Sequence, residues 1–62
     1  MLDLTAWAVR EALAYDGVPK DGDTLADQLD EDAADVRRAL SELAYEGEIM
    51  YCGDGCYVAA ME

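Results

Sequence analysis

Histidine and phenylalanine are absent from this chain of 62 residues, and lysine, serine and proline each occur once. Without histidine, the single serine and the two cysteines have no base to activate them, and no glycine-rich phosphate loop follows a strand. A hydrolase using two carboxylates would need a pocket that raises the pKa of one of them, for which so short a chain leaves little scaffold. We therefore expect no enzymatic activity, no cofactor and no small-molecule substrate.

Long hydrophobic runs are also missing. No apolar segment approaches the roughly 20 residues that span a bilayer, and the first residues lack the basic start and small-residue cleavage site of a secretory signal. These absences predict a cytoplasmic protein without a membrane partner. The hydrophobic content of 53% nevertheless predicts a folded chain. Its length fits one domain, residues 1–62, that buries only about 60% of the surface exposed by the unfolded chain.

Basic residues are scarce, with four Lys and Arg against 15 Asp and Glu, and the formal net charge is -11. Asp outnumbers Glu, and the composition resembles that of proteins from salt-accumulating halophiles. At about 1 M salt the Debye length falls to about 3 Å, so self-repulsion of such a surface costs little. The alternative is a chain that binds basic partners or mimics nucleic acid. We favour halophilic adaptation because the acids are spread over every segment.

Residues 4–15 show the i, i+3, i+4 spacing of an apolar helix face, with Asp3 as a candidate N-cap. The residues predicted to form that face are Leu4, Trp7, Ala8, Ala12 and Tyr15. Val9, Leu13 and Ala14 broaden the face beyond what one small core requires. Burial in the core is the expected role of Trp7 and Tyr15, and a dimer interface is the alternative.

Two more helices and a hairpin are predicted after the first helix. Thr24 is expected to cap a short helix at 25–29, and Asp32 a longer helix at 33–46 that Gly47 ends. From residue 48 the apolar period changes to two, and residues 53–55 have the composition of a tight turn, which predicts a hairpin over 48–59. Residues 18–19 can add a minimal strand beside it. One core is expected to enclose Leu25, Leu29, Val36, Leu40 and Ile49.

The segments 24–29, 36–40 and 43–49 together resemble a winged helix-turn-helix, and the resemblance covers residues 4–59. Such domains occur in small prokaryotic transcription regulators and as stand-alone winged-helix proteins. The resemblance implies an α+β fold of three helices followed by a two-stranded hairpin, the wing. It also implies that the helix starting near Asp32 enters the DNA major groove and that the wing reaches an adjacent groove.

Carried onto this chain, the resemblance implies groove-facing positions at Ala33, Ala34, Arg37, Arg38 and Ser41, with Thr24 and Lys20 available for phosphates. Of these, only Arg37 or Arg38 can pair bidentately with guanine. Their structural alternative is ion pairing with Asp35 or the 41–42 segment, and carboxylates near the start of the helix can simply cap it. Acidic residues crowd the motif, and the hairpin has no Lys or Arg, so the basic footprint of a DNA-binding protein is missing.

Two functions therefore stay open. The first is a transcription-regulator-like module of a halophilic prokaryote that binds double-stranded DNA. The second is a winged-helix association module that binds a protein partner or forms a homodimer.

Cys52 and Cys56 flank the predicted turn, where they can lie opposite each other at a separation that a disulfide allows. Free thiols are the interpretation we favour for a reducing cytoplasm, and a redox-responsive pair comes second. A metal site comes last, because two cysteines supply half of a tetrahedral zinc site and the chain has no histidine. No metal is therefore expected.

Overall fold

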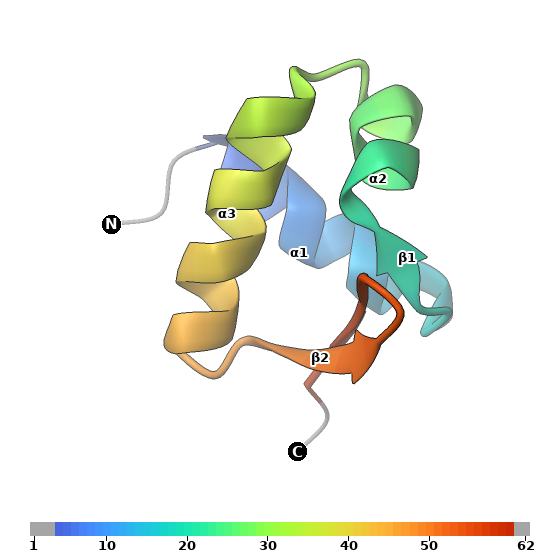
Figure 1. Cartoon of the computed structure of the whole chain (residues 1–62), viewed down its shortest axis with the longest axis vertical. Helices are drawn as coiled ribbons and strands as arrows, with labels where there is room; N and C mark the ends of the chain where they lie inside the picture. Colours follow the sequence, from blue (N-terminus) through green and yellow to red (C-terminus); the bar gives the residue numbers. More distant parts are fainter. Residues whose placement is uncertain (1–3, 61–62) are drawn as a thin grey trace.

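The computed structural model describes residues 4–60 and has α+β architecture, with three helices and a three-stranded antiparallel sheet (Figure 1). The elements in chain order are α1 (Leu4–Asp16), β1 (Lys20–Asp21), α2 (Gly22–Leu29), α3 (Ala33–Tyr45), β2 (Ile49–Gly53) and β3 (Cys56–Ala59). The predicted α+β class is confirmed. Among the described residues, no helix is long and apolar enough to cross a membrane.

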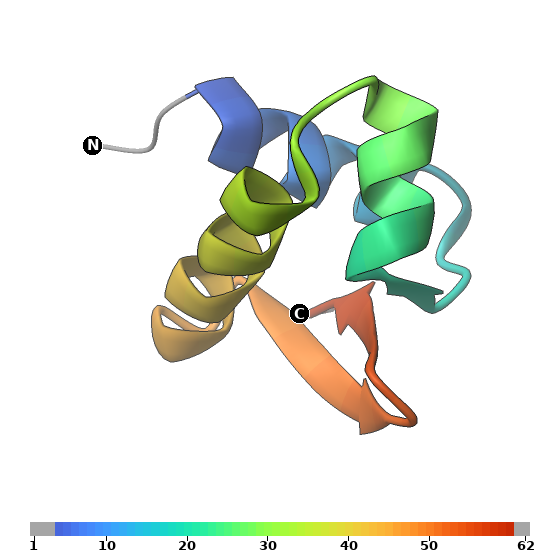
Figure 2. The same cartoon turned by 45° about the horizontal axis from the view of Figure 1, so that its top comes forward.

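The sheet has the order β1-β3-β2, so the prediction of a wing with only two strands is wrong in number. The short strand lies at Lys20–Asp21 rather than at residues 18–19, and its residues pair with Tyr57 and Cys56 of β3. Proline has no N–H to donate to a ladder, which explains why pairing begins after Pro19. In Figure 2 the hairpin of β2 and β3 projects beyond the helices.

The hairpin turn forms where the sequence predicts it. Asp54 and Gly55 both have positive φ, at 55° and 76°, as a type I′ turn requires at its two central residues. Gly53 pairs with Cys56 across the turn, and the register shifts between Tyr51 and Gly53. This irregularity leaves Cys52 without a register partner among the described residues of β3, so the expectation that the two cysteines lie directly opposite each other is wrong.

Helix α2 begins three residues before the predicted start, and its N-cap is Asp21 rather than Thr24. The Asp21 carboxylate accepts a hydrogen bond of 2.7 Å from the backbone N–H of Thr24. Asp21 takes this role because pairing with β3 holds its backbone extended, as an N-cap requires. The predicted cap Asp3 of the first helix lies outside the described residues.

Helix α3 starts where the sequence predicts and ends within one residue of the predicted end. The Asp32 carboxylate accepts a hydrogen bond of 2.8 Å from the backbone N–H of Ala34, which satisfies one of the free N–H groups of the first turn. The helix ends at Tyr45, one residue before the predicted end, and Gly47 supplies the left-handed exit at φ 81°.

One hydrophobic core joins the helices to the sheet. The predicted core residues Leu25, Val36, Leu40 and Ile49 are buried in it, and Leu29 packs against it while partly buried. The other buried members are Ala6, Val9, Leu13, Ala26, Ala39, Leu43 and Ala59.

The predicted core face of α1 is wrong for Leu4, Trp7 and Tyr15, whereas Ala12 packs against the core as predicted. Ala6, Val9 and Leu13 are fully buried, whereas Leu4, Trp7 and Tyr15 are 84%, 52% and 89% exposed. Both sets of residues follow helical periodicity, so spacing alone could not decide which set faces the core. The smaller residues face the core because α1 packs closely against α3 and β3.

Candidate functional site

A cleft of about 420 Å³ lies where the start of α2, the middle of α3 and the β2-β3 hairpin meet. It is lined by Gly22, Arg37, Ser41, Tyr51, Gly55 and Tyr57. Arg37 and Ser41 are one helical turn apart on α3, so their side chains share a face. Both residues therefore line the same cleft, beside the hairpin.

Close packing of α2 against α3 forms one end of the cleft. A Cβ at Gly22 would lie 3.2 Å from Cγ of Arg37 and 3.4 Å from a methyl carbon of Leu40. The absence of a side chain at Gly22 thus lets the first turn of α2 approach the aliphatic stem of Arg37.

Two tyrosines form the hairpin side of the cleft. The rings of Tyr51 and Tyr57 lie opposite each other on β2 and β3, with centroids 5.2 Å apart and planes tilted by 59°. The Tyr51 hydroxyl accepts a hydrogen bond of 3.0 Å from the backbone N–H of Gly55. This bond ties the tyrosine to the turn and gives the hairpin wall a defined shape.

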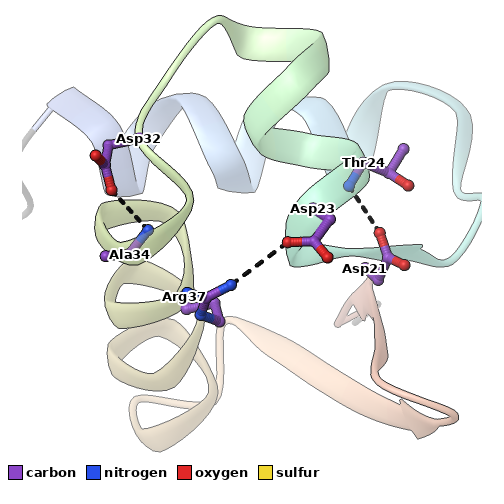
Figure 3. Close-up of polar contacts among 6 residues, drawn as sticks. All are labelled: Asp21, Asp23, Thr24, Asp32, Ala34 and Arg37. Carbon is purple, nitrogen blue, oxygen red and sulfur yellow. Dashed lines mark hydrogen bonds and ion pairs between the residues drawn. The ribbon is translucent and has the colours of Figure 1, made fainter.

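Arg37 reaches from α3 to α2, where its guanidinium lies 3.4 Å from the carboxylate of Asp23 (Figure 3). The side chains of Arg37 and Asp23 are 62% and 83% exposed. Ion pairs as exposed as this one contribute roughly 0 to 1 kcal/mol, so an incoming anion can displace Asp23 at little cost.

The other predicted DNA contacts do not line the cleft. Arg38 pairs within α3 with Asp35 at 3.4 Å, which is the structural alternative considered from the sequence. The Lys20 ammonium on β1 donates to the backbone carbonyl of Val18 at 3.4 Å. Thr24 is engaged by Asp21 (Figure 3), and hydrogen bonds from its side chain and backbone lower the pKa of the Asp21 carboxyl. The structure thus brings together only Arg37 and Ser41 of the predicted set.

A second surface feature lies between α1 and α2. It is a shallow groove of about 400 Å³ lined by Trp7, Ala8, Glu11, Ala12, Tyr15, Gln28 and Leu29. Trp7 and Tyr15, the candidates for a dimer interface, therefore stand on one exposed surface. We call the exposed side of α1 that comprises Leu4, Trp7, Ala8, Glu11, Ala12 and Tyr15 the α1 face.

The thiols of Cys52 and Cys56 are both free. Cys52 is exposed, and the sulfur of Cys56 lies 3.7 Å from the backbone carbonyl of Asp54. Across residues 4–60, no three metal-ligating side chains of Cys, Asp or Glu gather into a group that could hold a metal ion.

The sequence did not predict that Tyr51 and Tyr57 line the cleft, because this depends on how β2 and β3 pair. It also did not predict the close approach of Gly22 to Arg37, which depends on how α2 packs against α3. The alternating pattern after residue 48 is the signal that could have indicated the pairing of Tyr51 with Tyr57. Comparison of the chain with protein-family models, with curated proteins and with solved structures found no match.

Proposed function

We propose that this domain is a DNA-binding module of the winged-helix type, in which α3 and the β2-β3 hairpin face the duplex. The observation that carries the proposal is the cleft that Arg37 and Ser41 share with the hairpin. A guanidinium and a hydroxyl on one helix face can donate together to phosphate oxygens or to the acceptors of a guanine edge.

The net charge of the chain determines the salt concentrations at which DNA binding is expected. A net charge of -11 repels DNA at low ionic strength, and only Arg37 and Arg38 are placed on α3 to neutralise phosphates. Two phosphate contacts would give a plot of log affinity against log salt with a slope of about -2. Screening of the repulsion acts in the opposite direction, so we expect binding that is flat or rises as salt increases to about 1 M.

The proposal is tested by fluorescence anisotropy with a labelled random-sequence duplex in KCl from about 0.1 M to about 1 M. We expect binding at the upper end of this range, with Arg37→Ala weakening it by about tenfold or more. Asp23→Asn frees Arg37 and should strengthen binding. Glu46→Gln, at the C-cap of α3, changes the net charge equally and serves as the matched control.

No binding at any salt concentration would refute DNA recognition. Equal effects of Asp23→Asn and Glu46→Gln would show that net charge, rather than the Arg37 cleft, governs affinity. A slope steeper than about -2 would mean that more cations meet phosphate than α3 supplies.

A second candidate function is protein association, and the exposure of the α1 face favours it. Exposed Trp and Tyr side chains are the residue types most enriched at the energetic centres of protein interfaces. An association module of this kind would ignore duplex DNA and would keep its partner after Arg37→Ala.

A further inference from the structure

The α1 face carries three of the seven large hydrophobic side chains that are exposed among the described residues, Leu4, Trp7 and Tyr15. Leu4 and Trp7 are exposed in the first turn of α1 and Tyr15 about two turns later, and the small residues Ala8 and Ala12 lie between Trp7 and Tyr15 in the sequence. The shallow groove toward α2 lies beside these alanines, and Gln28 and Leu29 of α2 line it on the other side. The same surface thus offers both protruding side chains and a hollow able to receive them.

The α1 face also differs from the rest of the chain in charge. Its single acid is Glu11, whose carboxylate lies 3.6 Å from the guanidinium of Arg10. The other acids whose side chains the structure describes lie outside α1. A basic partner would be attracted to those acidic regions rather than to this nearly neutral strip, and an anionic membrane surface would be repelled by the chain.

We propose that the α1 face is the contact surface of a symmetric homodimer, in which α1 packs antiparallel against α1 of a second copy. A twofold contact brings the same patch of both copies together, so the large side chains of one copy would have to fit beside the small residues of the other. With the axis between Ala8 and Glu11, Leu4 would lie against Tyr15 of the partner subunit. Trp7 would lie against the small Ala12 of the partner subunit, so that a large side chain meets a small one in both directions.

The exposed area predicts a weak dimer. If a fully exposed aromatic side chain offers about 200 Å², Trp7 and Tyr15 at 52% and 89% exposure present roughly 280 Å² per copy. Both copies together then contribute roughly 560 Å² from aromatics, and the smaller residues add to this, against about 1,200 Å² at the lower end of standard interfaces. Repulsion between two chains of charge -11 weakens the dimer further at low salt.

Sedimentation equilibrium over a wide range of protein concentrations tests the proposal, in KCl at about 0.1 M and about 1 M. We expect a monomer-dimer equilibrium that strengthens with salt. The Trp7 emission should shift to shorter wavelength as the dimer forms, and this signal is unambiguous because the chain has one Trp.

Two substitutions with matched controls locate the interface. Tyr15→Ser should weaken dimerisation by about tenfold or more, because a symmetric interface loses the side chain twice. Tyr45→Ser removes a side chain that is 93% exposed at the end of α3 and should change it by less than about twofold. Glu11→Gln should strengthen the dimer at low salt more than Glu42→Gln, since Glu11 lies near the proposed axis.

Several results would overturn the proposal. A chain that stays monomeric at every concentration and salt tested would do so, as would equal effects of Tyr15→Ser and Tyr45→Ser. Dimerisation with an unchanged Trp7 spectrum would place the contact elsewhere. Circular dichroism of each variant separates loss of association from loss of folding, and Arg37→Ala should leave the dimer unchanged because Arg37 lines the other cleft.

Discussion

The orientation of α1 can be tested by stability measurements, because this helix has one apolar side that is buried in the core and another that is exposed. Leu13 is fully buried, whereas Tyr15, two residues later, is 89% exposed. Leu13→Ala should therefore destabilise the fold strongly, and Tyr15→Ser should leave it nearly unchanged. The opposite order would follow if the larger side chains of α1 faced the core.

The magnitude follows from burial and chain length. Truncating a buried Leu to Ala costs about 2 to 5 kcal/mol, through lost transfer free energy and the cavity left behind. A domain of 62 residues has a free energy of unfolding of roughly 3 to 9 kcal/mol, at about 0.05 to 0.15 kcal/mol per residue. Leu13→Ala should thus remove about half of the stability and lower the Tm by about 10 °C or more. Tyr15→Ser should change the free energy by less than about 0.5 kcal/mol.

Urea unfolding followed by circular dichroism at about 1 M KCl measures both variants, at a protein concentration low enough to keep the chain monomeric. Leu4→Ala is the matched control for Leu13→Ala, since Leu4 is 84% exposed on the same helix. A loss above about 1.5 kcal/mol for Tyr15→Ser, with less than about 1 kcal/mol for Leu13→Ala, would refute the assigned orientation of α1.

Three further predictions concern charge and local geometry. Raising KCl from about 0.1 M to about 1 M should stabilise the fold by on the order of 1 to 3 kcal/mol, because salt screens the repulsion among the acids of a compact chain with net charge -11 and a radius of gyration of 10.0 Å. A Tm that does not change with salt would contradict this. Hydrogen bonds from Thr24 hold the folded-state pKa of Asp21 below that of an ordinary aspartate, so its contribution to stability is present above the unfolded pKa and is lost as pH falls through the lower folded pKa. Asp21→Asn should therefore flatten the decline of stability in this acidic window, as measured by thermal unfolding. Gly55→Ala should cost about 1 to 2 kcal/mol because φ is 76° at this turn position, whereas Asp54→Asn should be tolerated at its φ of 55°, and urea unfolding compares the two.

Local chemistry made the α3 boundaries and the hairpin turn predictable from the sequence. Asp32 caps α3 and Gly47 exits it, and each role depends on a few neighbouring residues. The start of α2 was not predictable in this way, because Asp21 and Thr24 are both competent caps. Pairing of Asp21 with Cys56, distant in sequence, extends the Asp21 backbone and decides between them.

The candidate site was predictable only in its helical half. Spacing on α3 places Arg37 and Ser41 on one face, but the contact between Arg37 and Asp23 joins two helices and depends on their packing. The Tyr51-Tyr57 wall depends on strand register, including a shift that the alternating pattern does not reveal. Tertiary contacts thus determined the features that residue patterns left open.

Each of the three arginines is paired with a carboxylate of the chain, which limits its availability for DNA. Arg10 links α1 to Glu48 before β2 at 3.3 Å, and Arg38 is held within α3 by Asp35. Arg37 is the arginine that lines the cleft and whose carboxylate partner is most exposed, at 83%. DNA recognition would therefore require the ion pairs of Arg37 and Arg38 to open, whereas dimerisation through α1 would need no arginine to change partner. Because the cleft and the α1 groove share no lining residue, Arg37→Ala should weaken DNA binding alone, and Tyr15→Ser should weaken dimerisation alone.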